Sequence, residues 1–208
     1  MKYIKDLIER YPDLAPIAND IEAAYTVMER AYSNGGKLLV GGNGGSAGDS
    51  EHIVGELMKT FEKKRPIPAD VISKMEAIDP KRGALLGKEI QGALTAISIT
   101  GHTALTTAVG TDVRPEFGFA QQVYGYGREG DVLLAISTSG NSENLINAAI
   151  VAKAKGMKVV LLSGKTGGEL KNLADVSVIV PEDVTYKIQE RHLPIYHVIC
   201  MELEERFF

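Results

Sequence analysis

Short apolar runs alternate along the chain with longer segments in which apolar residues recur every three or four positions. The runs are rich in Val, Ile and Leu and are bounded by Gly, Ser or Asn, which is typical of buried strands. Strands are predicted over residues 37–41, 94–100, 131–137, 158–163 and 176–180. Helices are predicted over residues 2–10, 13–33, 45–60, 117–127, 142–156, 168–174 and 185–207, with a further helix ending near residue 110. This alternation indicates an α/β fold, a three-layer α/β/α sandwich around a parallel sheet.

Two segments stand outside this alternation. Residues 1–33 form N-terminal helices before the first strand, and residues 62–92 mix Pro, Lys and Gly with short apolar stretches. The latter composition predicts short helices and turns on the surface. Since no internal repeat or low-complexity segment divides the chain, we expect one domain over residues 1–208, with 62–92 as an extended surface link or lid.

Composition narrows the possible functions. Of the 208 residues, 44% are hydrophobic and 24% charged, and the formal net charge is −4. The only short basic cluster, Lys63-Lys64-Arg65, is interpreted as a solvated turn, so no nucleic acid partner is expected. No apolar run reaches the roughly 18 residues of a membrane span, and the charged N-terminus is unlike a signal peptide. The single cysteine, Cys200, fits a cytoplasmic protein and a packed thiol.

A glycine-rich turn follows the first predicted strand and leads directly into a helix. It reads G-G-N-G-G-S over residues 41–46, and the helix carries His52 and Glu56. Backbone N–H groups and the helix dipole at such a turn attract an anion. His52 and Glu56 are four residues apart and therefore share one helix face. This pattern suggests chemistry on a phosphorylated small molecule.

A second turn, rich in hydroxyl groups, follows the third predicted strand. Ser137, Thr138, Ser139 and Ser142 surround Gly140 and Asn141, and a helix begins next. Several hydroxyls and free N–H groups in one place suit a phosphate. The simpler interpretation is an ordinary turn with Ser142 as the N-cap. The number of hydroxyls favours phosphate binding.

Two nucleotide-binding patterns are weaker. Gly42, Gly44 and Ala47 formally meet the dinucleotide pattern, but the acidic residue expected about 20 positions later is only loosely matched by Glu62. Residues 164–166 resemble the end of a P-loop, yet the position of its first glycine is occupied by Val159. The P-loop is rejected and the dinucleotide interpretation ranks low.

The last predicted helix adds further candidate ligands. It carries Gln189, His192 and His197. His and Glu are common zinc ligands, and the carbonyl oxygen of Gln can also serve. The pair of His52 and Glu56 is therefore either a surface ion pair or one part of a metal site.

Three motifs together resemble the sugar isomerase (SIS) domain family. They are G-N-G-G-S-x5-H-x3-E, then G-D-V-L-L-x-I-S-T-S-G-N-S, then I-Q-E-x-H-x4-H. Within the family the chain is most similar to the phosphoheptose isomerases, and the likeness covers nearly the whole chain. The resemblance implies a flavodoxin-like, five-stranded parallel sheet and a homotetramer that uses residues 1–33 in packing and has active sites between subunits.

The resemblance also implies roles for individual residues. It places the sugar against Asn43, Gly44, Gly45, Ser46, Glu56, Thr111, Asp112 and Gln189, and the phosphate on Ser137, Thr138, Ser139 and Ser142. It implies one Zn²⁺ per subunit, held by His52, Glu56, Gln189 and His197. For the substrate contact after residue 110, Glu116 competes with Asp112.

The expected reaction is an aldose–ketose isomerisation, converting D-sedoheptulose 7-phosphate to a D-glycero-D-manno-heptose 7-phosphate through an enediol. Such a reaction needs a base and an acid or metal. We expect Glu56 to be the base and His197 to be the acid partner or a zinc ligand. The alternatives are another sugar phosphate, or a binding module without catalysis.

Two comparisons within the family bear on these alternatives. A sister branch that regulates replication initiation lacks the counterparts of Glu56 and His197, so their presence favours the enzyme. The chain departs from the family at Thr60, where arginine is usual, and in the longer link over residues 62–92. These departures concern the identity of the substrate more than the type of reaction.

Overall fold

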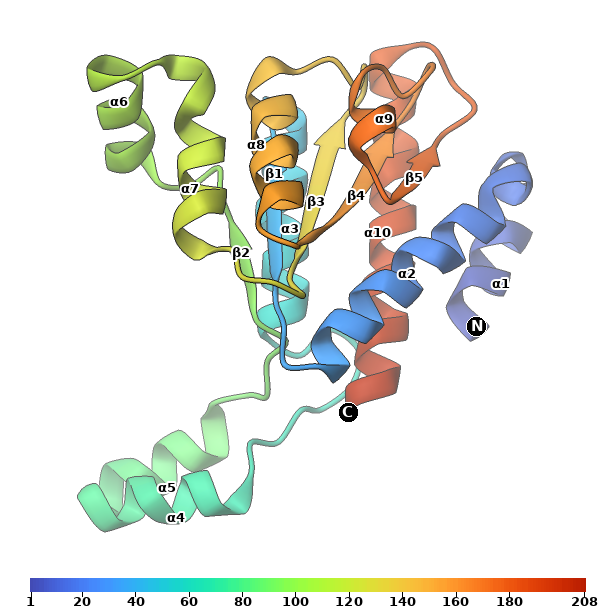
Figure 1. The fold of residues 1–208 in the computed structure, drawn as a ribbon. Helices are drawn as coiled ribbons and strands as arrows, with labels where there is room; N and C mark the ends of the chain where they lie inside the picture. Colours follow the sequence, from blue (N-terminus) through green and yellow to red (C-terminus); the bar gives the residue numbers. More distant parts are fainter.

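A five-stranded parallel sheet forms the centre of the fold in the computed structural model, which describes all 208 residues (Figure 1). The strands are β1 (Leu38–Gly42), β2 (Ala96–Ser98), β3 (Val132–Ser137), β4 (Lys158–Ser163) and β5 (Val176–Ile179). Their order in the sheet is β2-β1-β3-β4-β5. The predicted flavodoxin-like α/β/α sandwich is confirmed.

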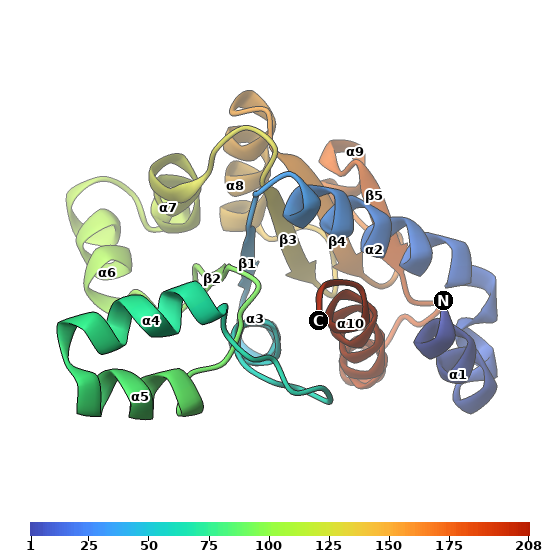
Figure 2. The same ribbon diagram turned by 90° about the horizontal axis from the view of Figure 1, so that it is seen from below.

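Helices cover both faces of the sheet (Figure 2). On one face, α1 (Lys2–Arg10), α2 (Ala18–Ser33), α3 (Gly45–Met58) and α10 (Thr185–Phe207) enclose the larger hydrophobic core. On the other face, α7 (Gly118–Tyr126), α8 (Glu143–Ala154) and α9 (Leu170–Leu173) enclose a second core, and α6 (Thr103–Asp112) packs outside α7. Because β1 and β3 are buried on both faces, they need continuous apolar sequence rather than alternation.

The predicted elements differ from the structure in two places. The helix expected over residues 13–33 is divided into the 3₁₀ helix η1 (Pro12–Ile17) and α2, with Pro16 inside the 3₁₀ segment. The strand expected over 94–100 is only three residues long, because β2 lies at the edge of the sheet and pairs only with β1. The helix α10, by contrast, continues through Pro194 as one element. None of the helices is both long and apolar enough to cross a bilayer.

Residues 66–91 form an arm that projects from the body of the molecule (Figure 1). It contains α4 (Ala69–Ile78) and α5 (Pro80–Glu89), which pack mainly against each other. Its two ends are held together where Pro66 and Gln91 form an antiparallel bridge and the N–H of Gly92 donates to the carbonyl of Arg65 at 2.6 Å. The segment predicted as short surface helices is thus a helical arm on a closed root.

The order of the strands fixes where a ligand can bind. From β1 the chain moves to β2 on one side, and from β3 it moves to β4 and β5 on the other. Ligands of open α/β sheets bind beyond the carboxyl ends of the strands at such a reversal. The glycine turn follows β1 and the serine turn follows β3, so both lie at this point.

Candidate active site

The serine turn is prepared to receive an anion. The hydroxyl oxygens of Ser137 and Ser142 lie 3.0 Å apart, and the backbone N–H of Gly140 donates to Ser137 Oγ at 3.1 Å. The backbone N–H groups of Thr138, Ser139 and Ser142 have no partner in the chain. Ser142 is the N-cap residue of α8. Free N–H groups, hydroxyls and a helix N-terminus converge here, which is the arrangement that binds phosphate.

The loop over residues 164–170 packs against the serine turn and holds it in place. Gly140 has a φ of +69°, and a Cβ at this position would lie 1.8 Å from the carbonyl oxygen of Gly167. Asn141 Oδ1 accepts the N–H of Glu169 at 3.0 Å, and the carbonyl of Gly140 accepts the N–H of Leu170. The turn is therefore held against residues 164–170, and only glycine fits at position 140.

The glycine turn lies next to the serine turn. Asn43 and Asn144 exchange two amide hydrogen bonds of 2.9 Å, which join the glycine turn to the first helical turn of α8. Gly44 has a φ of +56°, and a Cβ added there would have no atom within 4 Å, so its side is open. Asn43, Gly44 and Gly45 are exposed, whereas Ser46 is buried in the first turn of α3. The glycine turn is therefore accessible to solvent beside the serine turn.

Helices α3 and α10 pack side by side and run in the same direction. At the start of the pair, a Cβ on Gly45 would approach Gln189 Nε2 to 2.6 Å. In the middle, the ring centroids of His52 and His197 are 5.0 Å apart. At the end, Glu204 contacts the segment after α3. Gln189 therefore lies against the glycine turn, and His197 lies against His52. The structure brings together His52, Glu56 and His197, and places Gln189 about two helical turns away, beside the glycine turn.

His52 and Glu56 are held by their neighbours. His52 Nε2 lies 3.2 Å from Glu56 Oε1, while His52 Nδ1 lies 3.0 Å from the hydroxyl of Tyr196. The same hydroxyl donates to Asp49 Oδ1 at 3.2 Å, so its oxygen is free to accept from Nδ1. In that tautomer, the lone pair of Nε2 faces a carboxylate oxygen, an arrangement that is favourable only with a proton or a cation between them.

His197 has an unsatisfied nitrogen. Its Nε2 is buried without a hydrogen-bond partner, and its ring contacts His52, Tyr196 and Phe61. Burial, with a smaller contribution from His52, lowers the pKa of His197 below its ordinary value, so the ring is neutral at pH 7. A neutral imidazole with a free lone pair can accept a proton or bind a metal.

These donors match the chemistry of a zinc site without forming a closed one. Two imidazoles and a carboxylate share one neighbourhood, and the unpartnered Nε2 of His197 and the facing pair of His52 and Glu56 fit a cation. No three side chains of the His, Cys, Asp and Glu types converge closely enough to hold an ion by themselves. The predicted fourth ligand, Gln189, lies against Gly45 rather than with these three side chains.

Other predicted residues lie farther away. Thr111 and Asp112 end α6, which packs mainly on α7 and the 3₁₀ helix η2 (Pro115–Phe117), and the Thr111 hydroxyl donates to its own helix. Glu116 is on η2, which contacts α8, and its carbonyl accepts from Asn147 Nδ2 at 3.4 Å. Within one chain, neither Thr111 nor Asp112 joins the other site residues.

His192 is a core residue rather than a ligand. It is completely buried, and its Nε2 lies 3.2 Å from the carbonyl oxygen of Ser163. Burial lowers the pKa of His192 to about 4, so it is neutral and donates this hydrogen bond. The similarly buried Cys200 has a raised pKa, which agrees with the predicted packed thiol.

Sequence reasoning missed two residues at this site and two more beyond the end of α3. Tyr196 and Asp49 orient His52, and Asp49 lies three residues before His52 on the same helix, a spacing that pointed to it. The interpretation of Lys63-Lys64-Arg65 as a solvated turn is wrong for Arg65, which is only 2% exposed. It forms an ion pair with Glu204, because that carboxylate on the buried side of α10 compensates its charge.

Comparisons with known proteins identify the family of the chain. The SIS domain model matches residues 2–97 and 91–164. A phosphoheptose isomerase from Akkermansia muciniphila is 35% identical over 99% of this chain and 96% of that protein. One from Dechloromonas aromatica is 40% identical over 88% of this chain and 82% of that protein.

Solved structures give the same result. A phosphoheptose isomerase from Francisella tularensis has a TM-score of 0.75 and 32% identity, over 98% of this chain and 95% of that one. Another from Neisseria gonorrhoeae has a TM-score of 0.74 and 30% identity, over 97% and 91% of the two chains.

Proposed function

This chain belongs to the SIS domain family and, within it, to the phosphoheptose isomerases, and from that premise we propose an aldose–ketose isomerase. The proposed reaction converts D-sedoheptulose 7-phosphate to a D-glycero-D-manno-heptose 7-phosphate. The observation that carries the proposal is the position of Glu56: it pairs with His52 on α3, the helix that begins at the glycine turn beside the phosphate-type serine turn.

In this proposal the serine turn holds the phosphate and the glycine turn holds the sugar. The hydroxyls of Ser137, Thr138, Ser139 and Ser142 and the free N–H groups of the turn supply the donors that a dianion needs. The amide pair between Asn43 and Asn144 joins the two turns, so the sugar chain extends from α8 toward α3. Binding the phosphate at a distance from the reacting carbons fixes their orientation.

Glu56 acts as the base. Its carboxylate removes a proton from C1 of the ketose to give an enediol, and then returns a proton to C2 to give the aldose. The hydroxyl proton moves in the same sense, from O1 to O2, and the neutral His197 is our candidate to carry it when its nitrogen holds no metal. The carboxylate of Glu56 is 12% exposed, so little water competes for its proton.

We also propose that one zinc ion per subunit binds His52, Glu56, Gln189 and His197. Support comes from the unpartnered Nε2 of His197 and from the 3.2 Å contact between His52 Nε2 and Glu56 Oε1, where that nitrogen carries a lone pair if Nδ1 donates to Tyr196. The hydroxyl of Tyr196 would orient His52 as an outer partner. When bound, the metal would supply Lewis-acid polarisation of the substrate carbonyl. A ligating His197 nitrogen cannot also carry a proton, so ligation and proton transfer exclude each other at that atom.

A homotetramer with active sites between subunits completes the proposal, acting in the cytoplasm. Support comes from Thr111 and Asp112, which lie on α6 away from the other candidate residues of the same chain. A surface cleft of about 790 Å³ beside β5 includes none of the candidate residues. In this proposal α1 and α2 pack between subunits.

The test is turnover of a panel of ketose and aldose phosphates by the purified protein, with Glu56→Gln as the matched control. We expect activity on the seven-carbon ketose phosphate, and its loss in the variant while phosphosugar binding is retained. Turnover confined to a different sugar phosphate would favour the alternative substrate. Phosphosugar binding without turnover in the unaltered protein would favour a regulatory module and refute the enzyme.

A further inference from the structure

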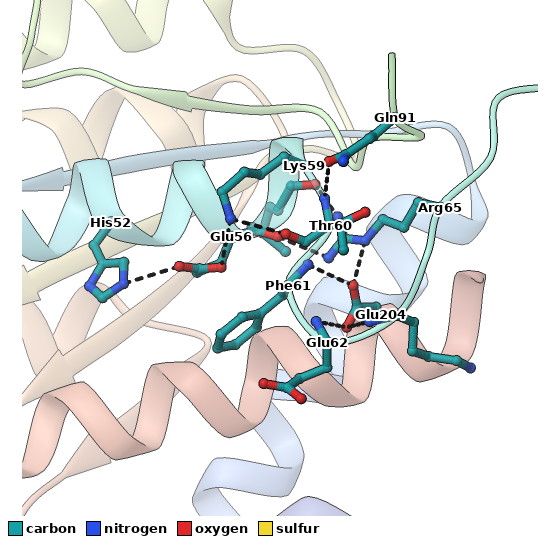
Figure 3. Close-up of polar contacts among 11 residues, drawn as sticks. His52, Glu56, Lys59, Thr60, Phe61, Glu62, Arg65, Gln91 and Glu204 are labelled. Carbon is teal, nitrogen blue, oxygen red and sulfur yellow. Dashed lines mark hydrogen bonds and ion pairs between the residues drawn. The ribbon is translucent and has the colours of Figure 1, made fainter. Parts of the chain in front are cut away.

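A fully buried ion pair lies at the end of α3, outside the site described above (Figure 3). Arg65 Nε donates to Glu204 Oε1 at 2.7 Å, and the two side chains are 0% and 1% exposed. The same carboxylate accepts the backbone N–H groups of Phe61, Glu62 and Lys63 at 2.8–3.1 Å. Glu204 therefore fixes the segment that leads from α3 to the arm.

The other arms of the Arg65 guanidinium reach the helix that carries Glu56. Nη1 donates to the carbonyl of Leu57 at 2.7 Å, and Nη2 donates to the carbonyl of Glu56 at 2.9 Å. The last carbonyls of a helix have no intrahelical partner, and a cation at that end is favoured by the helix dipole. Arg65 thus acts as a side-chain cap of α3, directly on the peptide unit of Glu56.

The contacts on the exposed side of this helix end are weaker. Lys59 Nζ is 3.5 Å from Glu56 Oε2, but its side chain is 59% exposed. The backbone N–H of Thr60 donates to Gln91 Oε1 at 2.8 Å, at the root of the arm. Arg65 joins the backbone of Glu56 to α10, the helix of Gln189 and His197, through one hydrogen bond to the Glu56 carbonyl and one hydrogen-bonded ion pair with Glu204.

A stability role alone would not require a charge here. Burial of two charges is costly, and replacement of a buried ion pair by apolar side chains is often neutral or stabilising. What a guanidinium adds is a rigid planar fork that sets three acceptors at fixed positions. In this structure two of those acceptors are the carbonyls of Glu56 and Leu57, and the third belongs to α10.

We propose that Arg65 and Glu204 are positioning residues for Glu56, holding the end of α3 in register with α10 so that the carboxylate stays aligned with His52 and His197. This inference rests on the proposed function of Glu56. Both side chains are buried beyond the end of α3, so we expect them to affect the placement of the base rather than the binding of the phosphate. A misplacement of about 1 Å at a reacting group can lower the rate on the order of 100-fold.

The experiment compares Glu204→Gln with Glu205→Gln. The second variant removes the same charge from the adjacent residue, whose partner Lys63 lies 3.3 Å away in an exposed pair. We expect Glu204→Gln to lower kcat about 10- to 100-fold with KM nearly unchanged, and Glu205→Gln to change neither. Thermal unfolding and light scattering show whether each variant keeps its fold and assembly.

A second variant, Arg65→Lys, separates the bonds to α3 from the ion pair. Lysine keeps the charge beside Glu204 but cannot donate to Leu57, Glu56 and Glu204 in the fork geometry, so kcat should again fall while KM holds. This variant decides the question if Glu204→Gln does not fold. Unchanged kcat in a folded variant would overturn the proposal, and so would a parallel loss of kcat, phosphosugar affinity and stability, which marks a structural role.

Hydrogen exchange distinguishes failure of this inference from failure of the proposed function. Amides of the last turn of α3 should exchange faster in Glu204→Gln than in Glu205→Gln. If the unaltered protein shows no isomerase activity but this difference in exchange appears, the proposed function fails, while the role of Arg65 and Glu204 in holding the end of α3 is supported. If the protein is active and neither exchange nor kcat responds to Glu204→Gln, the inference fails alone.

Discussion

Replacement of Gly140 by alanine tests whether the serine turn depends on its close contact with residues 164–170. Two effects add at this position. The φ of +69° lies in the left-handed region, which costs an L-residue roughly 1–2 kcal/mol. The new Cβ would also lie 1.8 Å from Gly167 O and 2.2 Å from its carbonyl carbon, so backbone must move, at about 1–3 kcal/mol. The sum is roughly 2–5 kcal/mol of lost stability.

The matched control is Gly130→Ala. Gly130 has a φ of +85°, but a Cβ added there would have no atom within 4 Å, so only the conformational effect remains, roughly 1–2 kcal/mol. Chemical denaturation of the two variants separates the effects, because the difference between them is the cost of displacing the loop. The displaced loop should also raise KM for the sugar phosphate in Gly140→Ala alone. Equal unfolding free energies and equal KM values in the two variants would refute this account of the turn.

Three further predictions concern single side chains. Glu56→Gln should retain sugar-phosphate binding measured by calorimetry while turnover falls by orders of magnitude; near-normal turnover would exclude Glu56 as the base. Metal analysis should find stoichiometric zinc in the purified protein and in the control His102→Ala, but a reduced zinc content in His197→Ala. A chelator should remove the activity, and added zinc should restore it. A full zinc content in His197→Ala would contradict the proposed ligands. The low pKa of His192, caused by burial, stabilises the fold above pH 6.5, and this contribution of roughly 3 kcal/mol should be lost between about pH 6.5 and 4. His192→Leu should therefore have a flatter dependence of unfolding free energy on pH over that range, and an unchanged slope would show that another group is responsible.

Much of the fold followed from patterns that extend over several residues. The apolar runs of β1, β3 and β4 are long and buried on both faces, so their sequence signal is strong. The edge strand β2 was predicted too long, because its residues have the composition of a strand but only one neighbour with which to pair. The two loops that meet beyond β1 and β3 could be placed together because parallel strands end on the same edge.

The site was predictable where a motif carries its own geometry. His52 and Glu56 share a helix face, and their contact follows from spacing alone. The surroundings of this pair were not predictable, because Tyr196 and Glu204 come from a helix more than 130 residues away and appear in the sequence as ordinary members of an amphipathic pattern. Arg65 was misjudged for the same reason: the partner that makes its burial possible is remote in sequence.

Because the root of the arm is closed, a change in the length of the arm need not alter the geometry of the candidate active site. Since Pro66 and Gln91 pair with each other, residues 67–90 begin and end at nearly the same place. The arm therefore joins the rest of the fold at one short turn-like junction, regardless of the length of the segment between its two ends. Such a junction tolerates insertion and deletion, as exposed tips with adjoining ends do in general. Through this junction the protein can gain or lose a whole structural module without shifting β1, β3 or α10, so related chains can diverge in size while keeping one chemistry.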